Sequence, residues 1–149
     1  MRLGLARARI ASVALALLAL SCGKFQQARE CGTFVKTVNG WLGSPALKGT
    51  ADAGGSSDPK AIAAEARATA QHYADLSSSL ADLHVQSEEL APRVKRYQDI
   101  ANDAARTLRE VADSLDQGDL EKARQKRVDF DTVAQREPSL VKEINGVCR

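Results

Sequence analysis

Aromatic residues are scarce in this chain, at 4% of its 149 positions, and runs of β-branched residues are few. Alanine and leucine are abundant instead. Both residues favour helices, whereas strands favour β-branched and aromatic side chains. The composition therefore predicts an all-α fold.

The chain also lacks the short motifs of common catalytic and cofactor sites. No serine lies within Gly-x-Ser-x-Gly, and no glycine-rich loop ends in Lys-Ser or Lys-Thr. His72 and His84 lack the glutamate three residues earlier that metal-binding bundles use, and His84 with Glu88 is a lone pair. The haem-attachment run Cys-x-x-Cys-His is missing too. We therefore expect a non-enzymatic protein with no cofactor and no metal site.

The N-terminus has the pattern of an export signal. Arg2, Arg7 and Arg9 have no acidic neighbour, and an uncharged run rich in Ala, Leu and Val covers residues 10–21. This run has about a dozen residues, whereas a helix needs roughly 20 to cross the hydrocarbon of a membrane. We therefore predict that residues 1–21 are a signal peptide, which is removed on export.

The end of this signal, LALSC at positions 18–22, resembles the lipobox of bacterial lipoproteins. The resemblance implies cleavage before Cys22, diacylation of its sulfur, and membrane lipid as a partner of residues 22–149. In similar families an Asp directly after the cysteine often retains the protein at the inner membrane, so Gly23 favours the outer membrane. The alternative is an ordinary secretory signal that leaves Cys22 as a free or paired thiol.

Without its signal the chain is close to neutral. It has 21 basic and 19 acidic residues in total, and residues 1–21 account for three arginines and no acid. The basic excess therefore belongs to the signal, and a nucleic-acid partner has little support. Residues 22–149 are enough for one domain with a single core.

Two further cysteines remain if Cys22 carries lipid. Cys31 and Cys148 would both enter an oxidising compartment on export, so we predict a disulfide between them. The alternative is two separate buried thiols.

Apolar residues spaced by three and four predict four amphipathic helices. The first covers residues 25–42, and a mobile loop is expected at residues 43–57. Asp58 and Pro59 open the second helix, which ends near residue 85. Gly118 and Asp119 separate the third helix from the fourth, and Pro138 predicts a kink or short break in the fourth. The apolar stripe of the first helix consists of Phe25, Ala28, Cys31, Val35, Val38 and Leu42.

Short connections make consecutive helices antiparallel, so we predict an up-down-up-down four-helix bundle. This topology places the start of the first helix beside the end of the fourth, where Cys31 and Cys148 lie. A disulfide would therefore close the bundle at the end nearest Cys22, which would be the membrane-proximal end.

Two basic clusters are expected at opposite ends of this bundle. The proximal cluster would rest on anionic headgroups, or it is simply a solvated surface. The distal cluster, with Trp41 and the loop, is the predicted partner-binding tip, and its alternative is an ordinary exposed basic helix. The proximal cluster comprises Lys24, Arg29, Arg93, Lys95, Arg96, Lys142 and Arg149, and the distal cluster comprises Lys122, Arg124, Lys126 and Arg127.

Taken together, these patterns predict a membrane-anchored lipoprotein of the bacterial cell envelope that binds or spaces another envelope component. The alternative is a carrier of small molecules or lipid inside the bundle, where Ala66, Thr69, Ala101 and Ala104 would leave space.

Overall fold

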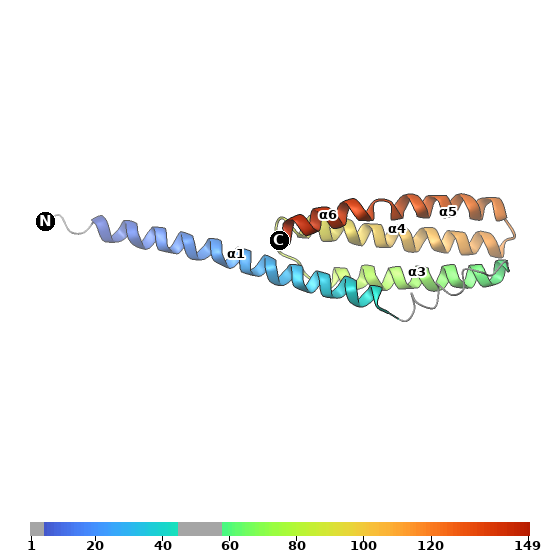
Figure 1. Ribbon diagram of the computed structural model, residues 1–149, viewed down its shortest axis with the longest axis horizontal. Coiled ribbons are helices and arrows are strands. Elements are labelled where there is room, and N and C mark those ends of the chain that lie inside the picture. Colours follow the sequence, from blue (N-terminus) through green and yellow to red (C-terminus); the bar gives the residue numbers. More distant parts are fainter. Residues whose placement is uncertain (1–4, 45–57) are drawn as a thin grey trace.

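The computed structural model describes residues 5–44 and 58–149, with side chains from Gly23 onward. All regular elements of this part are α-helices, so the predicted all-α fold is confirmed (Figure 1). The predicted cleavage, the Cys22 side chain and the predicted loop after Ser44 lie outside the described residues. The helices are α1 (Leu5–Leu42), α3 (Pro59–Ala81), α4 (Ala91–Asp116), α5 (Leu120–Ala134) and α6 (Glu137–Val147).

Local signals begin α3 and α5 where the sequence predicts, whereas α3 ends at Ala81, before its predicted end near residue 85. The Asp58 side chain accepts a hydrogen bond from the Lys60 backbone N–H at 3.1 Å. Pro59 occupies the first turn of α3, where its missing donor is not needed. Asp119 caps α5 in the same way, directly after Gly118 has adopted a left-handed φ of 74°.

The predicted fourth helix is divided into α5 and α6, which both pack on α4 (Figure 1). α5 ends at Ala134, and Pro138 lies in the first turn of α6. Inside a continuous helix this proline would remove a hydrogen bond and clash with the preceding turn. The predicted break is therefore confirmed, a few residues before the proline.

The helix packing is compatible with the predicted bundle, because α1 contacts α3, α3 contacts α4, and α4 contacts α5 and α6. However, α1 ends with Trp41 against His72, 13 positions after Pro59. At 1.5 Å per residue, α1 stops about 20 Å short of the far end of α3. α3, α4 and α5 continue past it (Figure 1). We call the part that α1 covers the proximal half and the rest the distal half.

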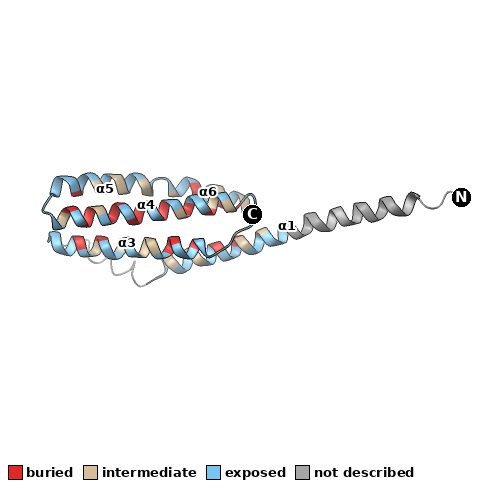
Figure 2. Ribbon diagram, turned by 180° about the vertical axis from the view of Figure 1, so that it is seen from behind, coloured by how far each residue is buried: buried red, intermediate tan, exposed pale blue. Residues whose placement is uncertain are grey.

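The buried side chains differ between the two halves, and α4 contributes many of them in both (Figure 2). Large residues from α1, α3, α4 and α6 fill the proximal half, whereas small residues dominate the distal half. Small side chains let α3 and α4 lie close together there. The distal cluster consists of Ala63, Ala66, Val111 and Ala112, with Leu115 packed against it.

The predicted stripe of α1 is wrong as a single buried face. Phe25, Val35 and Leu42 are 69%, 42% and 52% exposed. Phe34, which the prediction left out, is 5% exposed and meets Tyr97 edge-on, with ring centroids 5.6 Å apart. The apolar residues of α1 span a wider arc than the neighbouring helices cover. Their spacing alone does not show which part of this arc faces inward.

Cys31 and Cys148 form the predicted disulfide, with their Cα atoms 5.6 Å apart. This distance lies within the usual range for the bond. The bridge joins α1 to the residue after α6 across 117 positions, so the first helix and the end of the last one meet as predicted.

Replacing Cys31 and Cys148 by serine should lower the free energy of unfolding by about 4–5 kcal/mol, because the bridge restricts the unfolded chain. Urea unfolding followed by circular dichroism measures this loss. Reductant should destabilise the native protein in the same way and leave the double variant unchanged. Equal stability of the two proteins without reductant would contradict the prediction.

Ala70→Leu should destabilise the fold by about 1–3 kcal/mol, because the Ala70 side chain is 0% exposed and an added side chain has no room. Ala68→Leu on the exposed face of α3 is the matched control, expected to change stability by less than about 0.5 kcal/mol. Thermal unfolding compares the two variants. Similar midpoints would show that the helices do not pack closely at Ala70.

Candidate functional site

The structure separates Trp41 from the rest of the predicted partner-binding tip. The Trp41 indole stacks on the His72 ring with centroids 5.0 Å apart, and its N–H donates to the His72 carbonyl at 2.9 Å. Ser44 Oγ lies 2.9 Å from His72 Nε2. Through these contacts the C-terminal end of α1 packs against the middle of α3. Trp41 therefore has a packing role there, away from the start of α5.

The basic residues of the predicted tip lie on α5, and most of them are already paired. Lys122 has no ion pair with a described residue, while the other three each meet a carboxylate. This pairing removes most of the positive potential that would attract an acidic partner. The pairs are Arg124–Glu121 (3.2 Å), Lys126–Glu110 (2.8 Å) and Arg127–Asp131 (3.4 Å).

Part of the proximal basic cluster is paired as well. Arg96 donates to Glu143 at 2.6 Å, and Arg93 Nε lies 4.0 Å from the same carboxylate. The hydrogen bond from Arg96 holds the pKa of Glu143 below its usual range, although partial desolvation opposes it. Lys95 pairs with Asp99 on α4. These paired cations are less free to meet a membrane surface.

The small residues that would make room for a carried ligand are packed. Ala66, Ala101 and Ala104 are 8%, 1% and 2% exposed, and Thr69 is half-buried. Ala66 belongs to the distal core cluster and Ala101 to the proximal one. The hollows found among the described residues are lined by other side chains. No observation therefore favours the carrier.

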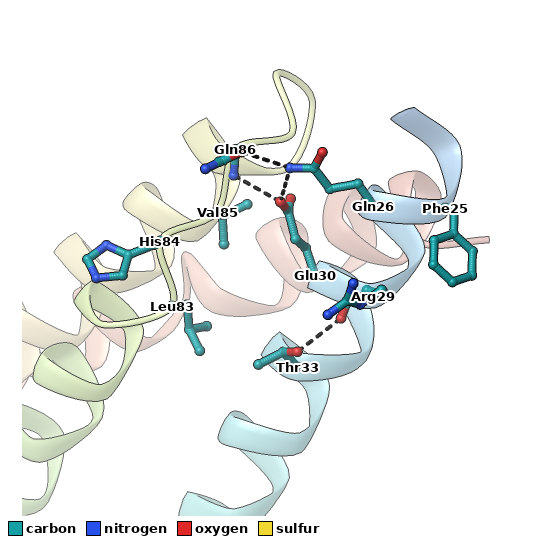
Figure 3. Close-up of a pocket in the computed structure, with 9 residues that line it drawn as sticks. All are labelled: Phe25, Gln26, Arg29, Glu30, Thr33, Leu83, His84, Val85 and Gln86. Carbon is teal, nitrogen blue, oxygen red and sulfur yellow. Dashed lines mark hydrogen bonds between the residues drawn. The ribbon is translucent and has the colours of Figure 1, made fainter. Parts of the chain in front are cut away.

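A cleft of about 520 Å³ lies between α1 and the connection from α3 to α4 (Figure 3). Gln26 and Glu30 point from α1 toward this connection, whereas Phe25 points away from it. The cleft combines apolar and polar walls at the proximal end. Its lining consists of Phe25, Gln26, Arg29, Glu30, Thr33, Leu83, His84, Val85 and Gln86.

Glu30 is the residue that holds the two sides of this cleft together. Its carboxylate accepts hydrogen bonds from the backbone N–H groups of Gln86 at 3.1 Å and Ser87 at 3.0 Å. The Gln26 side chain donates to it at 2.9 Å. Burial raises the pKa of Glu30, but these three hydrogen bonds together lower it below the usual value. The carboxylate therefore has a structural role, because it links α1 to the connection between α3 and α4.

His84 adopts a left-handed backbone conformation, with φ 46°, in the turn after α3. This conformation costs energy for any residue with a side chain. The imidazole is exposed and points away from Glu30 (Figure 3). Across the described residues, no group of three His, Cys, Asp or Glu side chains could hold a metal ion.

This cleft was not predicted from the sequence. One available signal is the spacing of Gln26 and Glu30, four apart on the polar side of α1. That spacing puts both side chains on one face, but it does not reveal the distant connection that they bind. The cleft offers Arg29, an imidazole and apolar walls, which suits contact with another molecule better than proton transfer by Glu30.

Glu30→Ala should destabilise the protein by about 1–2 kcal/mol at neutral pH, because two backbone N–H groups lose a charged acceptor. Glu88→Ala, in the same connection and exposed, is the control. Because the fold lowers the pKa of Glu30, this stabilisation exists above the ordinary glutamate pKa and is lost as the pH falls through the lowered value. Unfolding at several pH values measures it; a difference that grows in acid would contradict the assignment.

No described helix is long and apolar enough to cross a membrane. Comparisons with protein-family models, curated proteins and solved structures found no match to this chain. The residues and their geometry are therefore the basis for the functional proposal.

Proposed function

We propose that residues 22–149 are a non-enzymatic lipoprotein of the bacterial envelope, anchored by acylated Cys22, that binds or spaces another envelope component. Membrane lipid is then its first partner. The outer membrane is the favoured location, on the resemblance of the signal and on Gly23.

The Cys31–Cys148 disulfide carries this proposal. Disulfides persist in exported, oxidising compartments, which agrees with the basic and apolar N-terminal signal. The pairing also uses both other cysteines and leaves Cys22 available for lipid.

The geometry around the anchor supports a display or spacing role. Gly23, the residue after Cys22, already lies within α1. Nine helical residues from Cys22 to the disulfide correspond to about 14 Å, so the bundle would begin close to the membrane. α4 has 26 residues, and its length of about 39 Å is the distance over which the bundle could hold its distal end away from the bilayer.

Cys22→Ser should release the protein from the membrane fraction and leave the fold intact, because anchoring depends on the acyl chains. Fractionation after a high-salt wash, with circular dichroism of the released protein, measures both effects.

The matched control is the double variant Cys31→Ser and Cys148→Ser, which removes the other two cysteines and should stay in the membrane fraction. Retention of the Cys22→Ser variant after the wash would refute the anchor.

A further inference from the structure

α1 carries a second apolar stripe, which faces solvent. Its three large members, Phe25, Val35 and Leu42, are 69%, 42% and 52% exposed, and its other members are exposed as well. The spacing alternates strictly between three and four, as in a coiled-coil seam. We call this stripe the outer seam; it consists of Phe25, Ala28, Gly32, Val35, Asn39 and Leu42.

The opposite edge of the same apolar arc is the inner seam, and it faces the bundle. Cys31 and Phe34 belong to the proximal core, and Val38 and Trp41 pack against it. The inner seam has the same alternating spacing as the outer seam. α1 is therefore patterned to meet helices on two sides, and the described bundle covers one of them. The inner seam consists of Gln27, Cys31, Phe34, Val38 and Trp41.

Gly32 lies within the outer seam, and nothing in the described structure requires a glycine there. A Cβ added at Gly32 would meet no atom within 4 Å. Glycine in an exposed helix interior is destabilising. The advantage of a missing side chain is that another backbone can approach closely. Ala28 lies one turn earlier, so the two small residues form a flat surface between Phe25 and Val35.

The charged residues that flank the outer seam on α1 itself are basic. Lys24, Arg29 and Lys36 form no ion pair with any described residue, unlike most cations of α4 and α5. The one acidic residue in the described part of α1 is Glu30, which is bound to Gln86 and Ser87. The outer seam thus combines an apolar stripe with free positive charge.

We propose that the outer seam docks an acidic amphipathic helix of another envelope protein. The apolar stripe would pack against the partner's apolar face, with a close approach at Ala28 and Gly32. Carboxylates beside that face would meet Lys24, Arg29 and Lys36. This inference deepens the proposed function by naming the surface and the partner's chemistry, and it rests on the export of this chain.

Two other occupants fit the outer seam less well. A second copy would place basic flanks opposite basic flanks in either orientation, which is repulsive. An anionic membrane surface would suit the charges, but it has no helical register and gains nothing from a glycine at position 32. Both the heptad spacing and Gly32 are explained by a helix.

A hollow of about 460 Å³ extends this surface at its proximal end, between α1 and the end of α6. Ala28 and Lys24 border it from α1, and Gly146 and Arg149 border it from the C-terminal side. Glu89 is the acidic residue in its lining. The hollow therefore adds one basic residue, Arg149, and one acidic residue, Glu89, beside the proximal end of the outer seam.

In-cell crosslinking tests the occupant directly. A photoreactive phenylalanine replaces Val35 in the full chain, expressed in the native organism, and mass spectrometry maps the crosslinked peptide. The same replacement at Val128, which is 56% exposed on α5, is the matched control. We expect adducts at position 35 within a helical segment whose apolar stripe is flanked by Asp or Glu, and few at position 128.

The other outcomes would overturn the proposal. Lipid adducts at position 35 would assign the seam to the membrane, and adducts with the same chain would assign it to self-association. Equal adduct formation at positions 35 and 128 would show that the seam has no dedicated partner. Because these readouts do not depend on acylation of Cys22, their failure is distinguishable from failure of the lipid anchor.

Two sets of variants define the contact. Reversing Arg29 and Lys36 to Glu should lower crosslinking at position 35 roughly tenfold through like-charge repulsion, while the same reversal at Lys122 and Arg124 should not. Gly32→Ala should raise the thermal midpoint, because alanine is the better helix former, yet lower crosslinking. Unchanged crosslinking in both seam variants would refute docking along this surface.

Discussion

The disulfide between Cys31 and Cys148 is the constraint on which the position of α1 depends. α3, α4 and α5 pack along much of their length, but α1 covers the proximal half only. The bridge holds α1 at Cys31, and Trp41 holds its C-terminal end on His72. Glu30 adds hydrogen bonds to the connection after α3. Because α1 is held at these few points, its other side faces solvent.

A gradient in side-chain size runs along the bundle and determines where four helices can pack. Leu76, Leu80 and Tyr97 hold α1 and α6 around a wide proximal core, whereas Ala63 and Ala112 bring α3 and α4 together at the other end. Charge follows a different division. Most cations of α4 and α5 meet carboxylates of neighbouring turns and helices, while Lys24, Arg29 and Lys36 of α1 form no ion pair with a described residue. α1 thus differs from α4 in both respects, because it packs in the proximal half and its described cations form no ion pair.

Much of the fold was predictable because its signals are local. Asp58, Gly118 and Asp119 act within a turn of their own position, and Pro138 interrupts the helix in which it lies. The cleft was not predictable, because Glu30 binds backbone groups that are more than 50 positions away in the chain. Trp41 was misplaced for a related reason, since the length of an isolated helix does not reveal how far its neighbours extend.

The sequence by itself determined the helices, the breaks between them and the pairing of two cysteines, because spacing, caps and cysteine number require no knowledge of neighbours. Tertiary structure alone decided which edge of α1 is buried. An apolar arc that includes both Phe34 and Val35 satisfies helical periodicity in either orientation. The choice was made by packing: Phe34 meets the Tyr97 ring and Cys31 meets Cys148, so Val35 is left in solvent.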